Sequence, residues 1–349
     1  VKKAMEIPGI GPCVFIDTAG FDDVGELGQM RVDKARKAIE KTDIALVITC
    51  DAEISREMEW IDALRKLDTP VIPIVNKADI LTGAEAEALC HLVEKSCGVY
   101  PILVSAKYGA GVDKIHAKMI EQLPDDYEAD EITGNLAKEG DTILMVIPQD
   151  IAAPKGRLIL PQVQILRELL DKKCIVLCST ADKMGSALAA LAKPPALIIT
   201  DSQVFPIVYG MKPAESKLTS FSILFAKYKG DLSSFIDGAD TIDALNERSR
   251  VLIAEACTHA PLTEDIGRTK IPALLRSKIG QGLQVDVVSG SDFPEDLSPY
   301  SLIIHCGACM FNKKHVMTRI RQAKSQGIPM TNYGVALAKL SGILDQIDY

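Results

Sequence analysis

The sequence predicts an α/β chain of several domains, built on parallel sheets. Two apolar runs, 44–48 and 71–75, carry no polar alternation, which is typical of strands buried on both faces of a sheet. Helical stretches separate such runs, and this alternation is the order of a doubly wound sheet. The chain has 349 residues, which is too long for one ordinary core, so we expect two or three domains.

The first domain is predicted to span residues 1–124. Its expected strands lie at 14–16, 44–48, 71–75 and 102–104, and its expected helices at 29–41, 55–67, 84–96 and 111–122. The acidic stretch at 124–128 begins with a proline and cannot continue the last helix, so it marks the end of this domain.

Two further α/β domains are predicted downstream, at 136–218 and 219–349. In the middle domain we expect strands at 142–147, 174–178 and 196–200 and helices at 161–172 and 182–191. The last domain opens with the apolar run 221–225, interpreted as a strand, and continues with strands at 250–256, 284–288 and 301–305 and a helix at 312–326. No convincing internal repeat is evident.

Composition limits the classes of partner and location. The formal net charge is −8, and no Lys/Arg block exceeds short helical clusters such as 31–37, so neither nucleic acid nor a membrane is expected as a partner. No apolar run approaches the ~18 residues that span a bilayer, and the N-terminus has no signal-peptide core, so we expect a cytoplasmic protein. The nine cysteines are then expected to be reduced, with Cys13, Cys50, Cys174 and Cys178 as core thiols.

Three short motifs directly follow three of the strands predicted in the first domain. Their residues are Asp17 and Gly20 of D-x-x-G, Asn76, Lys77 and Asp79 of N-K-x-D, and Ser105, Ala106 and Lys107 of S-A-K. Parallel strands release their loops at one edge of a sheet, where a D-x-x-G turn can reach a magnesium-bound γ-phosphate. Together the motifs predict a P-loop GTPase-type sheet that binds GTP with Mg²⁺.

Asp79 is the residue that selects guanine. Its carboxylate can accept hydrogen bonds from N1 and the exocyclic amino group of guanine, whereas adenine would leave the charge desolvated and unpaired. We expect Lys77 to lie along the base and Asn76 to tie neighbouring loops together. The backbone at Ser105 and Ala106 is expected to meet the guanine O6.

Two departures from an ordinary GTPase affect the expected activity. No G-x-x-x-x-G-K-S/T motif occurs, so we expect the phosphate loop and first switch to lie outside this chain through N-terminal truncation. Phe21 follows Gly20, where self-sufficient GTPases commonly carry a water-orienting glutamine. We therefore expect a slow GTPase, inactive without its phosphate loop, and assign no catalytic side chain.

A second group of residues predicts a metal centre in the last domain. Cys257 and His259 follow the strand at 250–256, and His305, Cys306 and Cys309 follow the strand at 301–304. A C-x-x-C turn at a helix start can chelate one ion, and Cys257 supplies a third thiolate. Three thiolates with histidines suit either a Cys₃His zinc site or a four-iron, four-sulfur cluster, and the spacing leaves both open.

The pattern C-x-H followed by H-C-x-x-C, behind a GTPase module, resembles the family of iron-iron hydrogenase maturation GTPases, HydF. Further similar segments lie at 22–28, 153–157, 261–268 and 329–334. The resemblance implies an N-terminal GTPase domain, a central dimerisation domain that forms a homodimer, and a C-terminal domain that binds a 4Fe-4S cluster.

The resemblance also implies a function. In that family the protein is a scaffold that accepts a two-iron precursor from partner radical-SAM enzymes and delivers it to apo iron-iron hydrogenase. Cys257, Cys306 and Cys309 match the cluster ligands, and His259 and His305 match the motif histidines, one of which would fill the fourth iron position.

Two other hypotheses remain open at this stage. A zinc-binding regulatory GTPase acting on ribosome or RNA assembly would share the guanine motifs and the C-x-x-C, although the acidic charge balance disfavours it. A metal-stabilised oligomerisation module would need no cargo. Iron and sulfide analysis separates the first from an iron-sulfur protein, and cargo transfer excludes the second.

Overall fold

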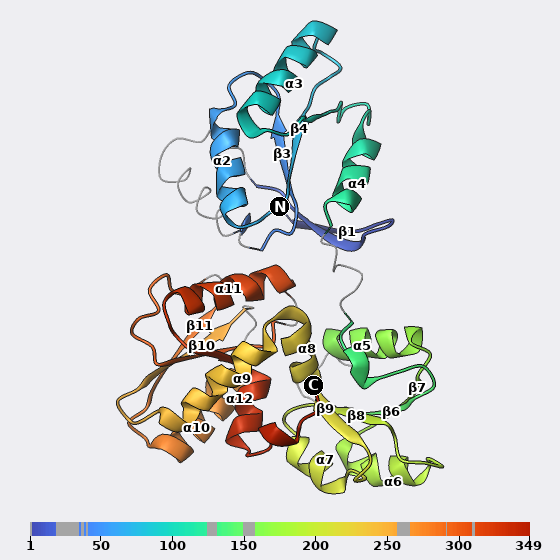
Figure 1. Ribbon diagram of the computed structural model, residues 1–349, viewed down its shortest axis with the longest axis vertical. Helices are drawn as coiled ribbons and strands as arrows, with labels where there is room; N and C mark the ends of the chain where they lie inside the picture. Colours follow the sequence, from blue (N-terminus) through green and yellow to red (C-terminus); the bar gives the residue numbers. More distant parts are fainter. Residues whose placement is uncertain are drawn as a thin grey trace. The chain divides into compact units, whose positions relative to one another are not determined.

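The computed structural model describes residues 2–18, 41–123, 131–148, 158–256, 266–290, 292–308 and 311–349, and the single positions 35, 38 and 39. The chain divides into two compact units, Val1–Ala129 and Asp130–Tyr349 (Figure 1). Parallel sheets with helices between their strands occur in both units, so the predicted α/β class is confirmed. The boundaries of the three predicted domains stay predictions. No helix in the part of the chain that the structure describes is long and apolar enough to cross a membrane.

The first unit contains a three-stranded parallel sheet in the order β3-β4-β5. Its strands and helices are β3 (Ala45–Thr49), α2 (Ser55–Lys66), β4 (Val71–Val75), α3 (Gly83–Cys97), β5 (Ile102–Leu103) and α4 (Val112–Glu121). The sequence defines α3 at both ends. Thr82 and Glu85 form a capping box at its start, and Gly98 ends it in the left-handed region, at φ 73°.

The predicted strand at 14–16 does not join this parallel sheet. It belongs to β2 (Gly11–Ile16), which pairs antiparallel with β1 (Lys2–Ile7) in a separate hairpin. Strands joined by a short turn pair antiparallel, and Gly9 and Gly11 adopt the positive φ angles that this turn requires. The doubly wound arrangement predicted for the first domain therefore holds for β3 to β5 only. Most of the predicted helix at 29–41 lies outside the described residues.

The second unit begins with a four-stranded, all-parallel sheet in the order β7-β6-β8-β9. Its elements are β6 (Thr142–Val146), α5 (Leu160–Asp171), β7 (Ile175–Ser179), α6 (Met184–Ala189), β8 (Leu197–Thr200), α7 (Phe205–Met211), β9 (Lys217–Ser220) and α8 (Phe221–Lys229). The central strand β6 is fully buried from Ile143 to Val146. Cys174 is buried as predicted, whereas Cys13 and Cys50 are only half-buried. The prediction for Cys178 is wrong: this thiol is exposed, because β7 is an edge strand.

A second parallel sheet follows, in the order β11-β10-β12-β13. Its elements are α9 (Leu232–Asp240), β10 (Arg250–Glu255), α10 (Ile271–Ile279), β11 (Gln284–Ser289), β12 (Leu302–His305), α11 (Lys313–Ser325), β13 (Met330–Asn332) and α12 (Tyr333–Leu340). Single turns of 3-10 helix lie at Gly134–Leu136, Ala181–Lys183, Thr241–Ala244 and Leu344–Gln346, and a π-helical turn at Ile266–Lys270.

The two sheets of the second unit repeat one topology, although no convincing internal repeat is evident in the sequence. In each, the first strand lies between the second and third strands and the fourth strand is outermost. In each, the fourth strand runs directly into a helix capped by the strand's last residue. Ser220 accepts a hydrogen bond from the Ile223 amide, and Asn332 from the Val335 amide. One hydrophobic cluster, which includes Leu144 of the first sheet and Leu252 of the second, joins the two halves.

The apolar run 221–225 is helix α8, so its interpretation as a strand is wrong. A short apolar run has no periodicity that separates a buried helix from a buried strand. The Ser220 side chain caps the Ile223 amide and starts the helix. Most of α8 is then buried, which explains the unbroken apolar sequence.

Candidate functional site

The N-K-x-D and S-A-K loops adjoin each other at the carboxyl ends of β4 and β5. The Ser105 Oγ donates to Asp79 Oδ1 at 2.6 Å, and the Ala106 amide donates to Asn76 Oδ1 at 3.0 Å. A backbone hydrogen bond from Ala78 to the Val104 carbonyl adds a third link. The two loops are thus held as one surface, with Asn76 tying them together.

Asp79 is exposed at the centre of this surface. The hydrogen bond from Ser105 lowers the pKa of Asp79, so the carboxylate is ionised at neutral pH. Lys77 adopts a positive φ of 65°, which is uncommon for a residue with a side chain and occurs often at ligand sites. An ionised, pre-oriented carboxylate is the chemistry that guanine recognition needs.

The remaining residues predicted for nucleotide binding are less completely placed. Asp17 is exposed immediately after β2, at the end of the hairpin rather than of a parallel strand. Lys107 Nζ lies 5.0 Å from the ring centroid of Tyr108. Gly20 and Phe21 lie outside the described residues.

In the second unit, the two predicted cysteine loops begin next to each other, at the same edge of the sheet. β10 and β12 are neighbouring parallel strands with Ala254 opposite His305. The Cys306 amide donates to the Ala254 carbonyl at 2.9 Å, and the Ala256 amide donates to the Cys306 Sγ at 3.0 Å. Cys257 follows Ala256 in the chain and Cys309 follows Ala308, but both cysteines, and His259, lie outside the described residues.

The surroundings of Cys306 suit a thiolate ligand. A backbone N–H that points at a sulfur favours the thiolate over the thiol. The site also lies at the carboxyl edge of a parallel sheet, next to the point where the strand order reverses, and this is where such sheets bind ligands. Among the described residues no group of three or more His, Cys, Asp or Glu side chains could hold a metal ion. Cys306 is the predicted thiol ligand whose surroundings the structure describes.

His305 is fully buried, and both ring nitrogens have partners. Arg319 Nη1 lies 3.0 Å from Nε2, and because a guanidinium only donates, Nε2 accepts and Nδ1–H donates to the Cys306 carbonyl at 2.6 Å. Burial and then the Arg319 charge lower the pKa of His305 to about 3, so the ring is neutral. In this arrangement His305 orients the loop. Its role as a fourth ligand stays a prediction and requires Arg319 to release Nε2.

An ion pair that no sequence motif indicated lies at the same edge, between the buried Glu255 and the exposed Arg268. Glu255, the last residue of β10, is 2.8 Å from Arg268 Nη2, and the Ser289 hydroxyl at the end of β11 donates to the same carboxylate oxygen. This pair fixes the π-helical turn at 266–270 against the sheet. The signal in the sequence was the position of Glu255 two residues before Cys257.

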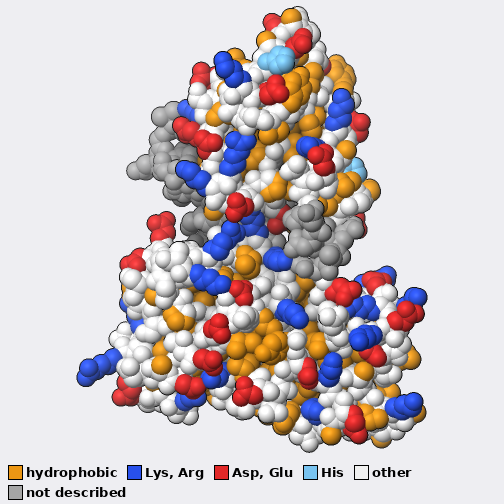
Figure 2. All heavy atoms as spheres, in the orientation of Figure 1, with side chains coloured by type: hydrophobic (Ala, Val, Ile, Leu, Met, Phe, Trp, Pro, Cys, Tyr) orange, Lys and Arg blue, Asp and Glu red, His pale blue; other side chains and the backbone are white. Residues whose placement is uncertain are grey.

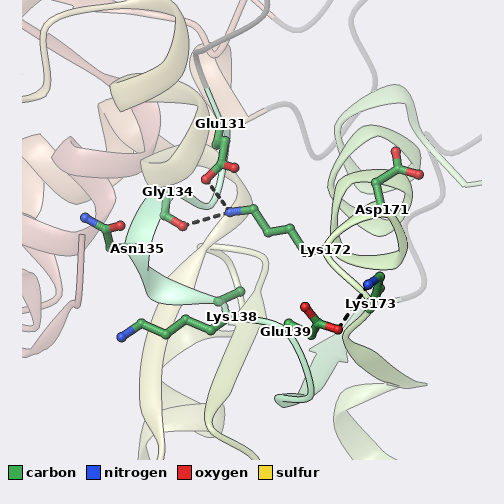
Figure 3. A pocket seen from close by; sticks show the side chains of 9 residues that line it. Glu131, Gly134, Asn135, Lys138, Glu139, Asp171, Lys172 and Lys173 are labelled. Carbon is green, nitrogen blue, oxygen red and sulfur yellow. Dashed lines mark hydrogen bonds and ion pairs between the residues drawn. The ribbon is translucent and has the colours of Figure 1, made fainter.

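A polar pocket elsewhere in this unit contains none of the predicted site residues (Figure 3). Its lining residues are Glu131, Gly134, Asn135, Ala137, Lys138, Glu139, Asp171, Lys172 and Lys173. Lys172 Nζ lies 2.7 Å from Glu131 Oε2 and donates to the Gly134 carbonyl at 2.8 Å. Glu168 accepts the amides of Ile132 and Thr133. These contacts attach the segment 131–134 to α5, so we assign a structural role to the residues of this pocket.

A guanine-type loop surface on one parallel sheet, and cysteine-bearing loops on another, define a multidomain α/β protein of the GTPase class. Two family models match the chain: Hydrogen maturase F dimerization domain over residues 132–230, and Hydrogen maturase F tetramerization domain over residues 233–347. The chain belongs to the hydrogen maturase F family.

Curated GTPases match about a third of the chain. The tRNA modification GTPase MnmE of Polynucleobacter asymbioticus is 31% identical over 124 residues, covering 34% of this chain and 26% of that protein. GTPase Era of Carboxydothermus hydrogenoformans is 29% identical over 119 residues, covering 33% of this chain and 40% of that protein. GTPase Der of Chromobacterium violaceum is 31% identical over 127 residues, covering 35% of this chain and 26% of that protein. The chain thus spans between about a quarter and two fifths of the length of these relatives.

Proposed function

We propose that the chain is a GTP-binding iron-sulfur scaffold that carries a two-iron precursor and delivers it to apo iron-iron hydrogenase. One observation carries the proposal: β10 and β12 bring their carboxyl ends together, and the Ala256 amide points at the Cys306 sulfur. Membership of the hydrogen maturase F family supports it. Radical-SAM maturation enzymes and the apo-hydrogenase are the proposed partners, in the cytoplasm.

Cys257, Cys306 and Cys309 are the proposed ligands of a 4Fe-4S cluster, with His259 and His305 as the accompanying histidines. Bound by three thiolates, such a cluster supplies one iron with an exchangeable position for cargo. The chain's own residues prepare the site. The Ala256 N–H stabilises negative charge on the Cys306 sulfur, and the Glu255–Arg268 pair holds the neighbouring turn.

GTP with Mg²⁺ is the proposed ligand of the first unit. Asp79, held by Ser105, accepts hydrogen bonds from the guanine N1–H and amino group, and Asn76 keeps the adjoining loop in place. Hydrolysis is slow and acts as a timer of partner exchange rather than as the source of iron chemistry. Asp79→Asn tests this pocket when the phosphate loop is present: preference in a binding titration shifts from GTP toward xanthosine triphosphate. An unchanged preference removes Asp79 from the pocket.

Self-association is part of the proposed function, since the family models that match are named for dimerization and tetramerization. We assign 1–124 to GTP binding, 136–218 to a homodimer contact and 219–349 to the cluster. Edge strand β7 exposes 63% of Ile175, and α5 exposes 45% of Val163 and 52% of Leu170. Figure 2 shows apolar side chains in patches on the visible face, among interspersed charges of both signs.

Cargo transfer tests the function itself. The chain is reconstituted, loaded with a two-iron precursor, separated from free precursor and incubated with apo-hydrogenase, and hydrogen evolution is measured. The expected result is activation by the loaded chain and none by Cys306→Ala treated identically. Equal activation by both proteins contradicts delivery from this site.

A further inference from the structure

Lys229 is a buried lysine at the end of α8, and its side chain reaches the C-x-x-C loop. Only 9% of the residue is exposed. Nζ donates to the Phe311 carbonyl at 2.8 Å and to the Ala308 carbonyl at 3.4 Å. These two carbonyls flank positions 309 and 310, so Lys229 bridges the loop from one side of Cys309 to the other.

Keeping an ammonium at this depth has a cost. Removing a charge from water costs several kcal/mol unless polar groups compensate it. Here the two carbonyls face Nζ, and the Phe225 ring centroid lies 5.2 Å away, at cation–π distance. Ala308 adopts a positive φ of 45°, which is unusual for a residue with a side chain, and its carbonyl is one of those that Lys229 holds.

A second buried cation stands at the other end of the same loop. Arg319 is 5% exposed, donates to His305 and to the Gly290 carbonyl at 2.5 Å, and lies 4.7 Å from the Phe293 ring centroid. The H-C-x-x-C segment is therefore bracketed by two buried positive charges, one from α8 and one from α11. Three cysteine thiolates make a bound iron-sulfur cluster anionic, and this is the charge that buried cations complement.

We infer that Lys229 is a positioning residue for the cluster: it holds the Ala308 and Phe311 carbonyls of the C-x-x-C segment in place, and its charge favours the reduced cluster. The inference rests on the proposed function. Two effects follow from one side chain. Losing the hydrogen bonds loosens the loop and lowers cluster retention, whereas losing the charge makes the reduction potential more negative.

Four proteins, each as the full chain, separate these effects: wild type, Lys229→Met, Lys229→Arg and Lys227→Met. Lys227 lies on the same helix but is exposed, so it controls for the loss of one lysine. Each is reconstituted anaerobically with iron and sulfide. Cluster content, its loss to a chelator over time, and the midpoint potential from a redox titration followed by electron paramagnetic resonance are measured, together with the melting temperature of the apo-protein.

The expected result for Lys229→Met is a several-fold faster loss of iron and a more negative potential of the remaining cluster. Lys229→Arg keeps the charge and restores the potential, and Lys227→Met matches wild type. Wild-type retention and potential in Lys229→Met overturn the inference, as does an equal effect of Lys227→Met. If apo Lys229→Met does not fold, Lys229→Gln replaces it, because the amide keeps a donor and loses the charge; an unshifted potential then overturns the inference. Failure of the wild-type chain to take up iron contradicts the proposed function instead.

Discussion

The two four-stranded sheets of the second unit share one topology and differ in the chemistry of their carboxyl edges. At the carboxyl ends of β8 and β9, the hydroxyls of Ser202, Ser220 and Ser222 form hydrogen bonds with one another at 2.5 to 3.2 Å. Behind β12, the corresponding edge carries the buried His305 and the Cys306 thiol. Ligands of parallel sheets bind at this edge. The same strand topology can therefore serve packing alone in the first sheet and ligand binding in the second.

The outer edges differ as well. In the second sheet, α9 covers β13 so closely that a Cβ on Gly238 would overlap the Met330 backbone. In the first sheet, Asp348 near the C-terminus covers β9 by exchanging hydrogen bonds with Leu218. Its opposite edge, β7, keeps Ile175 exposed. These differences agree with our proposal that the dimer contact lies on the first sheet and the ligand site on the second.

The largest difference is expected for cysteine removal. Cys306→Ala should abolish the visible absorption of the reconstituted cluster, because thiolates are the usual ligands and two anchors are too few. Cys178→Ala, which removes an exposed thiol of the first sheet, should leave it unchanged. Equal cluster content in both variants would break the assignment of the ligand edge to the second sheet.

Self-association should respond to the first sheet. Ile175→Glu places a charge on the exposed edge strand, and we expect at least about tenfold weaker dimerisation in sedimentation velocity, or ~1.4 kcal/mol. Val287→Glu, on the outer strand of the second sheet and 37% exposed in wild type, is the matched control. A larger effect of the control would move the dimer contact to the other sheet.

Glycine-to-alanine substitutions in the two halves should change the free energy of unfolding by different amounts. Gly238→Ala forces α9 away from β13, and we expect a loss of roughly 1–3 kcal/mol in denaturant unfolding. At Gly210, near the end of α7, a Cβ would meet nothing within 4 Å, so Gly210→Ala should be neutral or stabilising by about 0.5–1 kcal/mol. Similar losses in both would show that the close approach at Gly238 is unimportant.

The smallest effect concerns two helix caps. Lys324, and then Ser234, lower the pKa of Asp231, the cap of α9, to about 2, below its ordinary 3.8. A depressed pKa gives stability that is present above about pH 4 and lost as the pH falls toward 2. Asp231→Ala should therefore cost about 1 kcal/mol at pH 7 and less in acid. Ser220→Ala, in the cap of α8, should cost a pH-independent amount.

Local sequence signals predicted most of this fold, and the misses have identifiable causes. The apolar strands and the loops at Asn76 and Ser105 were accessible because each depends on neighbouring residues. The repeated topology was not, since the two sheets share strand order and capping rather than an obvious sequence. The partners of the H-C-x-x-C segment, Lys229 and Arg319, come from other elements and become evident only when those elements pack.

Metal analysis of the full chain distinguishes an iron-sulfur cluster from zinc at the cysteine loops. The chain is purified and reconstituted without oxygen, and iron, acid-labile sulfide and zinc are measured on one sample. The account predicts about four irons and four sulfides per chain, with an electron-paramagnetic-resonance signal on reduction. Stoichiometric zinc without sulfide would contradict it and would favour a zinc-binding GTPase.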